Sequence, residues 1–357
     1  MRRASAVTTP AADLLLTGGL SVLVLTPLIF AGFGFDQDRL NEQLLVASAL
    51  LNWPHFTASF VLLYGSRDQA RQHRFASFTF PLVLGVVGIG VVIAAARTGV
   101  PVLVASLLTS AYLAWHYTGQ AFGMMNVFAR IEGSPLEAAE RRLIRLALRL
   151  LLAFHVAWIH HLFPPDAFPA WFVAVFETAY RGLVALLPVA FGLGAYGLVQ
   201  YGRRIGRVPA ARVIVPFLAT VVWYVFLAVE PGGLVLVQLF HALQYLGFPI
   251  RVELNDFLSK SQETGRPATS FRRARNILIY YGALVGTGVL ALYVAPGVAQ
   301  GLVERAFGLA APGAAAAAAI LMFVNVHHYL TDATIWKLRD PRVRAAVLGH
   351  LPGPGQR

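Results

Sequence analysis

Apolar runs of about 18 or more residues recur along the whole sequence, and each is long enough to cross a hydrocarbon core of about 30 Å as a helix. Charged residues make up only 13% of the chain, whereas they make up about a quarter of an ordinary soluble domain. We therefore expect an all-α fold, a polytopic transmembrane helical bundle in which residues 1–357 form a single integral membrane domain.

Hydropathy predicts about ten spans, with no room for a soluble domain between them. The expected ranges are 12–33, 44–64, 77–96, 100–126, 143–163, 182–201, 212–229, 233–252, 276–296 and 311–335. The first apolar run, Leu14–Phe33, follows Arg2 and Arg3 as in a signal peptide. It is long and lacks a small-x-small cleavage site, so we expect a retained span.

Two segments that connect spans have compositions that predict structure at the membrane surface. In residues 134–150, charged residues alternate with leucines, which predicts an interfacial amphipathic helix that runs into the fifth span. Residues 164–181 contain prolines and aromatics together with Glu177 and Arg181. That composition favours a partly re-entrant or interfacial piece outside the membrane.

Basic residues collect in the loops that follow the even-numbered spans, whereas the opposite loops are short or acidic. The basic residues are Arg67, Arg71, Arg74, Arg130, Arg141, Arg142, Arg145, Arg203, Arg204, Arg207, Arg212, Arg266, Arg272, Arg273, Arg275, Arg339, Arg342 and Arg344. By the positive-inside rule these loops and both termini face the cytoplasm. The net charge of +12 is thus a topology signal, and no nucleic-acid partner is expected. The preference for Arg over Lys suggests a GC-rich bacterial genome, and the expected location is the bacterial inner membrane.

Histidines are concentrated inside the expected spans, which hold eight of the ten in the chain. These eight are His55, His116, His155, His160, His161, His241, His327 and His328, while His73 and His350 fall in cytoplasmic segments. A charged group at mid-span costs about 2.5–3.5 kcal/mol, so such residues usually face the protein interior and have partners. Without cysteine, any metal must be held by nitrogen and oxygen ligands.

The depth of these histidines groups most of them in one slab of the membrane. At 1.5 Å per residue from the outer face, His55, His155 and His241 lie roughly 12–17 Å deep. His116, His327 and His328 lie roughly 22–25 Å deep on the same count. By contrast, His160 and His161 lie only about 5 Å from the outer boundary, which fits an entrance and leaves open whether they join the cluster.

Polar companions stand one helical turn from several of these histidines. Metal-bound imidazoles usually donate their second N–H to such groups, which fix the ring orientation. We therefore predict a metal centre with ligands drawn from His55, His116, His241, His327 and His328. The residues predicted to hydrogen-bond the ligands, or to serve as additional ligands, are Asn52, Gln120, His155, Gln244, Tyr245, Asn325 and Asp332. Pro54 is expected to distort the second span beside His55.

Imidazole and carboxylate without thiolate suit iron, zinc, copper or manganese. A centre at mid-membrane is most readily reached by O₂ and by lipid-soluble molecules. The leading expectation is a non-haem iron oxygenase, an oxidoreductase that acts on an isoprenoid, carotenoid or other lipid substrate, with zinc or copper as possible metals. Two alternatives stay open: a bis-His haem protein, and a proton-coupled transporter with a His/Asp relay.

The positions His55, His116 and His241-Ala-Leu-Gln244 resemble the bacterial β-carotene 15,15′-dioxygenase family. This resemblance implies an integral membrane protein with a His-coordinated iron that cleaves carotene to retinal. The pattern Asn325-x-His-His328-x-x-x-Asp332-x-x-Ile-Trp-Lys337 resembles that of uncharacterised bacterial multipass proteins. Membrane fatty-acid desaturases match less well, because their histidine boxes lie at cytosolic helix ends and have other spacings.

The charge alternation makes a topology prediction. A reporter fused after Arg344 should be cytoplasmic, and one inserted at Asp36–Glu42 should be external, because the basic loops stay inside. Alkaline phosphatase activity reports an external position, and green fluorescent protein fluorescence reports a cytoplasmic one. Reversed signals would overturn the span map.

Overall fold

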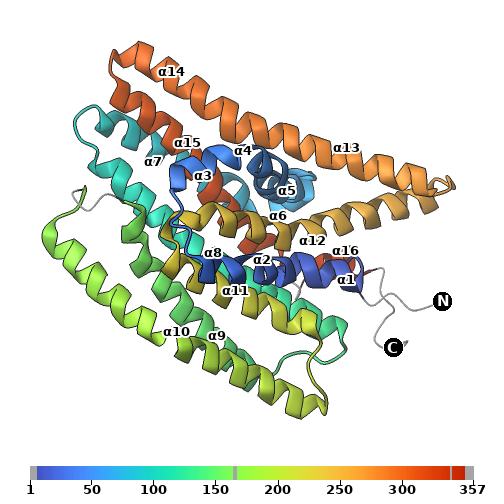
Figure 1. The fold of residues 1–357 in the computed structure, drawn as a ribbon. Coiled ribbons are helices and arrows are strands. Elements are labelled where there is room, and N and C mark those ends of the chain that lie inside the picture. Colours follow the sequence, from blue (N-terminus) through green and yellow to red (C-terminus); the bar gives the residue numbers. More distant parts are fainter. Residues whose placement is uncertain (1–5, 164–166, 338–339, 350–357) are drawn as a thin grey trace. The chain divides into compact units, whose positions relative to one another are not determined.

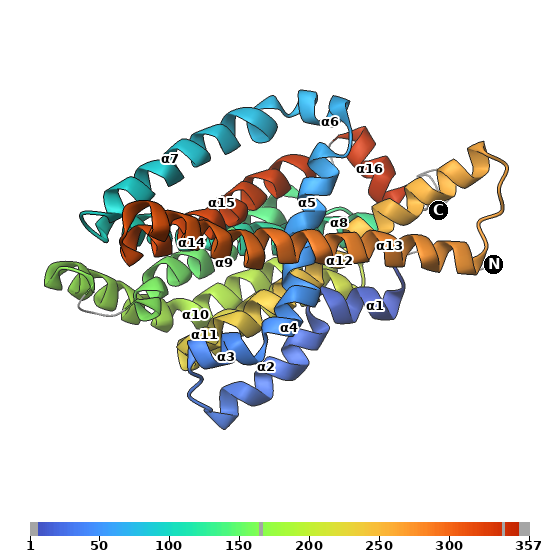
Figure 2. The ribbon, with the colours of Figure 1, turned by 90° about the horizontal axis from the view of Figure 1, so that it is seen from above.

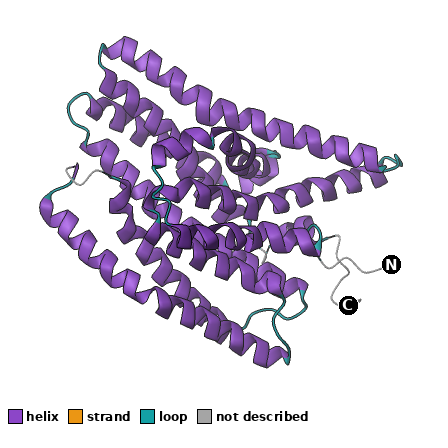
Figure 3. Ribbon diagram, in the orientation of Figure 1, coloured by secondary structure: helices purple, strands orange, loops and turns teal. Residues whose placement is uncertain are grey.

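The computed structural model describes residues 6–163, 167–337 and 340–349, and these residues form helices and loops without a strand (Figure 3). Ten of the helical segments are long and apolar enough to cross a membrane: Pro10–Ala31, Leu45–Tyr64, Phe75–Ala95, Val100–Ile131, Ala138–Leu162, Ala170–Ile205, Ala211–Val229, Pro231–Glu263, Ser270–Phe307 and Ala310–Ile335. Each corresponds to one expected span. The all-α, polytopic fold is thereby confirmed, and the chain is a multi-pass membrane protein.

Residues group into two compact units, each built from separate stretches of the chain. Among the described residues, unit 1 comprises 6–45, 114–163 and 167–247, and unit 2 comprises 46–113, 248–337 and 340–349. Arg339, His350 and residues 164–166, for which the sequence makes predictions, lie outside the described residues.

Unit 1 contains most of the N-terminal helices and the middle of the chain. Its elements are α1 (Pro10–Leu14), η1 (Leu15–Gly19), α2 (Leu20–Ala31), α3 (Gln37–Gln43), α9 (Ala138–Trp158), η4 (Ile159–Leu162), α10 (Ala170–Ile205), α11 (Ala211–Val229) and η6 (Pro231–Gly233). Two long helices, α8 (Val100–Ile131) and α12 (Leu234–Glu263), begin in one unit and end in the other. Within unit 1, α9 and α10 lie side by side and α11 packs against α2 (Figure 1).

Unit 2 is built around α15. Its elements are η2 (Ser48–Asn52), α5 (Trp53–Tyr64), α6 (Arg67–Gln72), η3 (Phe75–Thr79), α7 (Phe80–Ala95), α13 (Ser270–Val289), η7 (Leu290–Val294), α14 (Ala295–Phe307), α15 (Ala310–Ile335) and α16 (Pro341–Leu348), with α4 (Leu45–Ala47) at the boundary. The helix α15 lies between α7 and α14 and also contacts α5 (Figure 2). A Cβ added to Gly88 would be 3.6 Å from Ala319, so small residues allow α7 and α15 to approach closely.

The surfaces of these helices carry the apolar residues that a bilayer requires. On α7, Leu82 is 69% exposed and Ile89 is 63% exposed, whereas polar side chains such as Ser59 and His328 are fully buried. This distribution is the reverse of that in a soluble protein, because lipid solvates hydrocarbon and leaves polar groups to find partners inside the protein.

Three spans of unit 2 contain a π-helical turn directly before a proline. The turns η2, η3 and η7 are followed within two residues by Pro54, Pro81 and Pro296, respectively. Proline has no N–H to donate, and its ring crowds the carbonyl four residues earlier, so the preceding turn widens. The expected distortion at Pro54 therefore takes the form of this π-helical turn, and His55 follows it.

The fifth span begins as an extension of the predicted helix. The segment before the sixth span differs from its prediction. The helix α9 starts at Ala138 with a capping box formed by Glu137 and Glu140, and it continues without interruption into the membrane segment. Residues 170–181 form the first turns of the continuous helix α10, so the re-entrant form is wrong for this part, and the interfacial location stays a prediction. Glu177 and Arg181 pair at i,i+4 on one helix face, which lets the helix continue through both charges.

A buried ion pair joins α9 and α10. Glu140 is only 3% exposed, accepts hydrogen bonds from the Glu137 backbone N–H and from Arg204, and lies 2.6 Å from Arg204 Nε. Glu140→Ala should lower the free energy of unfolding by about 1–2 kcal/mol, because it removes the capping box and the shortest contact of Arg204, which keeps Glu137 and the Pro135 backbone oxygen as partners. Thermal unfolding in detergent measures the loss. The exposed Arg142→Ala is the control, and an equal effect of both variants would contradict this assignment.

Candidate metal centre

Two helices of unit 2 bring His55, His328 and Asp332 together. The Nε2 atoms of His55 and His328 are 2.9 Å apart, and His328 Nε2 lies 3.6 Å from Asp332 Oδ2. Each of the three residues offers one ligand atom, and these atoms lie within 4.8 Å of one another. His55 is 1% exposed, His328 is fully buried and Asp332 is 8% exposed. The group is thus a buried His/Asp cluster that can hold a metal ion.

Helical periodicity explains why these side chains meet. On α15, His328 and Asp332 are one turn apart and share a face. On α5, His55 and Ser59 have the same spacing, and the Ser59 hydroxyl donates a hydrogen bond to Asp332 Oδ1. Each helix therefore contributes a histidine and, one turn later, an oxygen. Ser59 was not among the predicted residues, although its position four residues after His55 places it on the same helix face.

The distances within the cluster fit a small divalent cation. Ligand atoms about 2.1 Å from one metal lie about 3.0–3.4 Å from each other in octahedral or tetrahedral geometry. The observed separations of 2.9 Å and 3.6 Å bracket that range. Without a metal, two neutral imidazoles at this distance share one proton, which one ring donates and the other accepts.

Aromatic rings surround the cluster and separate it from water. Phe56 contacts His328 edge-on with ring centroids 4.7 Å apart, and it lies 5.4 Å from the His55 ring. Tyr329 and Phe60 lie 5.7 Å and 6.5 Å from the His328 ring. A surrounding of low polarity strengthens electrostatic interactions inside it, which favours a cation between these ligands.

His327, the neighbour of His328, points to different partners. Its Nε2 lies 2.9 Å from the backbone oxygen of Ala76 and 3.3 Å from the Tyr64 hydroxyl, and its ring stacks on Phe60. Because a carbonyl only accepts, Nε2 of His327 carries the hydrogen and serves as a donor. Successive residues on α15 point about 100° apart, and here His327 reaches Ala76 and Tyr64 while His328 faces His55 and Asp332.

Unit 1 contains a second group of the predicted residues. The rings of His116 on α8 and His241 on α12 have centroids 4.8 Å apart, and Tyr117 lies 4.3 Å from His241. The Gln120 amide nitrogen lies 3.1 Å from both Nδ1 and the backbone oxygen of His241, and 3.4 Å from Gln244 Oε1. In this arrangement His241 Nδ1 accepts, so its Nε2 carries the hydrogen, and metal binding by Nε2 would require the Gln120 amide to turn over.

The remaining predicted residues lie in different surroundings. Asn52 is half-buried directly before α5, and Tyr245 is buried in unit 1. Asn325 donates to the backbone oxygen of Leu321 and accepts from the Tyr329 hydroxyl, so it orients that tyrosine. That His116 and His241 share one centre with His55 and His328 stays a prediction.

His155 on α9 is fully buried, and neither of its ring nitrogens has a hydrogen-bond partner among the described residues. Its ring lies 5.4 Å from Trp158 and 5.6 Å from Tyr224, whose polar atoms likewise have no partner there. Buried polar groups are nearly always hydrogen-bonded, so these three side chains are placed to bind water or a polar ligand. The sequence flagged His155 but gave no sign of the aromatic residues around it.

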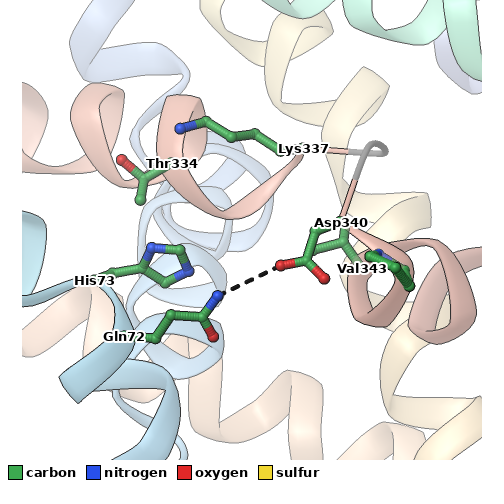
Figure 4. Close-up of a pocket in the computed structure, with 7 residues that line it drawn as sticks. Gln72, His73, Thr334, Lys337, Asp340 and Val343 are labelled. Carbon is green, nitrogen blue, oxygen red and sulfur yellow. Dashed lines mark hydrogen bonds between the residues drawn. The ribbon is translucent and has the colours of Figure 1, made fainter.

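A polar pocket of about 500 Å³ lies at the end of α15 (Figure 4). It is lined by Gln72, His73, Thr334, Lys337, Asp340, Pro341 and Val343. The Gln72 amide lies 3.5 Å from Asp340 Oδ2 across it. The lining combines charged and polar side chains with the apolar Pro341 and Val343.

No family model, curated protein or solved structure matches the chain.

The surroundings of His155 make a stability prediction. His155→Leu should maintain or increase stability, because an unsatisfied buried polar group costs about 1–3 kcal/mol. The matched control is Phe154→Leu on the same helix, which removes buried hydrocarbon and should destabilise the protein. Thermal unfolding of both variants in detergent measures the difference. If His155→Leu were the more damaging of the two, the imidazole would have a stabilising partner.

Proposed function

We propose that the chain is a membrane-embedded non-haem iron oxygenase that acts on a lipid-soluble substrate. The observation that carries the proposal is the convergence of two imidazole nitrogens and one carboxylate oxygen in a buried part of unit 2. Two histidines and one carboxylate with open coordination positions are the ligand set typical of non-haem Fe(II) oxygenases. Zinc accepts the same ligands, so the metal itself has to be measured.

Each protein residue of the cluster has a distinct role in this proposal. Nε2 of His55 and of His328 and Oδ2 of Asp332 would hold the metal, while the Ser59 hydroxyl fixes the other oxygen of Asp332. Such outer hydrogen bonds orient ligating carboxylates and strengthen the site. When bound, iron would supply the chemistry that brings O₂ to react with a C–H or C=C bond. The ring of Phe56 beside His328 excludes water and orients an apolar substrate.

The position of the cluster supports a substrate that arrives through the bilayer. The ligands lie on two membrane-spanning helices, α5 and α15, within an apolar surrounding. Isoprenoids, carotenoids and lipids partition into the same hydrocarbon. Cleavage of a C=C bond by both atoms of O₂ needs no external reductant, which agrees with the dioxygenase resemblance of the sequence. That resemblance and the location in a bacterial inner membrane, with both termini cytoplasmic, belong to this proposal.

The short nitrogen separation favours non-haem iron over haem. Axial ligands on opposite faces of a haem are about 4 Å apart, because each bond to iron measures about 2 Å. The 2.9 Å between His55 Nε2 and His328 Nε2 leaves no room for a porphyrin plane between them.

One observation favours a proton-coupled transporter as a second candidate. Ser59, Asp332, His328 and His55 form a continuous chain of short polar contacts, and such chains relay protons in membrane transporters. A relay of this kind works without a transition metal, so metal content separates the two functions.

Metal analysis of the protein purified without chelators tests the proposal. Iron should copurify at about one per chain, and His328→Ala and Asp332→Asn should each lose it while the protein stays folded. Ser59→Ala should weaken binding by roughly 10–100-fold, because it removes a hydrogen bond to a ligand. The matched control is His327→Ala, which removes the adjacent imidazole from α15 and should keep the metal.

Equal metal loss from His327→Ala would contradict the assigned ligands. Wild-type protein without a transition metal would favour the transporter instead. The same assay on His116→Ala and His241→Ala tests whether these residues are ligands as the sequence predicts. Comparing isoprenoid and lipid extracts of cells that produce the wild type or His328→Ala identifies the substrate class.

A further inference from the structure

A second group of metal-binding side chains lies in unit 1, where the fifth and sixth spans are connected. His160 and His161 stand in η4 at the end of α9, and Glu177 stands two turns into α10. Each residue offers one ligand atom, and these atoms lie within 4.8 Å of one another. None of these residues belongs to the cluster proposed above.

The hydrogen bonds of His160 prepare its Nε2 for a cation. Nδ1 contacts the backbone oxygen of Ala157, which can only accept, so Nδ1 carries a hydrogen. Nε2 lies 3.1 Å from Glu177 Oε2, which is also an acceptor. In a neutral imidazole two lone pairs would face each other across this gap. A cation between the two atoms, or a second proton on the ring, removes the repulsion.

A backbone carbonyl bound to Nδ1 is also the usual partner of a metal-ligating histidine, because it fixes the tautomer and the ring orientation. The His160 side chain is only 9% exposed, so its orientation is held by the surrounding protein. The site therefore offers a preoriented nitrogen ligand opposite a carboxylate.

The second imidazole is held beside the first. The ring centroids of His160 and His161 are 3.9 Å apart, and Tyr180 from α10 packs against both at 5.4 Å and 4.5 Å. This tyrosine, about one turn after Glu177 on α10, restricts both rings. The arrangement lowers the entropy that ligand ordering would otherwise cost.

Arg181 completes the arrangement from one turn along α10. Its Nε lies 2.6 Å from Glu177 Oε1 and so occupies the carboxylate oxygen that does not face His160. Ligating carboxylates are commonly hydrogen-bonded in this way on their outer oxygen. Oε2 stays directed at His160.

We propose that His160, His161 and Glu177 form a zinc site that ties the end of α9 to α10. Two histidines and one glutamate are a known three-ligand set for Zn²⁺, with water in the fourth position. The positive-inside pattern places this connection on the outer side of the membrane, where the ion enters without crossing the bilayer. The ion bridges two spans at their joined ends, so it stabilises their packing.

Zinc titration of the full-length protein in detergent tests the site. The titration uses the His328→Ala variant as the parent protein, because this variant lacks a ligand of the His/Asp cluster. A chelator removes any bound metal before the titration. One Zn²⁺ per chain should bind, and it should raise the thermal unfolding temperature. His160→Ala and the isosteric Glu177→Gln should each lose this ion and the temperature shift.

Two controls separate a metal site from an ion pair. Arg181→Gln should weaken zinc binding by at most roughly 10–100-fold without abolishing it, because Arg181 holds only the outer oxygen of Glu177, and His73→Ala in unit 2 should leave it unchanged. Zinc binding that is absent from the background protein, or unchanged in Glu177→Gln, would overturn the proposal. In that outcome His160 carries two protons and belongs, with Arg181, to an ion-pair network around Glu177. The His/Asp cluster lacks a ligand in this background and does not contribute to the measured zinc. A negative result here therefore leaves the proposed function untouched, and the reverse also holds.

Discussion

Hydrocarbon offers no hydrogen bonds, so every backbone N–H and C=O group within a membrane span must be satisfied by the protein itself, and an unpaired polar side chain there is costly. This constraint explains the helical backbone throughout the described spans, since a helix pairs its own N–H and C=O groups. It also explains the irregular turns. Where Pro54, Pro81 and Pro296 remove a donor, the chain widens into a π-helical turn rather than leaving a break. In unit 2 one such turn comes directly before His55, so a backbone adjustment and a candidate ligand coincide.

The same constraint gives each buried histidine a different state. His328 faces another imidazole and a carboxylate, whereas its neighbour His327 donates to a backbone oxygen. His160 lies between a carbonyl and a carboxylate. His155 has aromatic rings around it and no hydrogen-bond partner among the described residues. Residue type alone therefore does not define function in this protein, because the groups within about 3–4 Å decide which nitrogen carries a proton and which can bind a metal.

Stability and function compete within the His/Asp cluster. A buried carboxylate beside two imidazoles costs desolvation free energy, and the Ser59 hydroxyl offsets only part of that cost. An apolar core would be a more stable use of the same space. The retention of these groups in an apolar, aromatic-lined interior is the physical reason to regard the cluster as functional, since a bound cation would compensate the carboxylate charge directly.

The sequence by itself determined the ten spans, because hydrophobic length is a local property and each helix needs only its own residues to cross the bilayer. It also identified the buried histidines and Asp332, since ionisable groups stand out in apolar runs. The tertiary structure decided which of them meet. A helix turns about 100° per residue, so a small rotation of α15 decides whether His327 or His328 meets His55, and hydropathy does not report that rotation. For the same reason the sequence did not reveal that Ser59 reaches Asp332, that Asn325 binds Tyr329, or that residues 170–181 continue as α10.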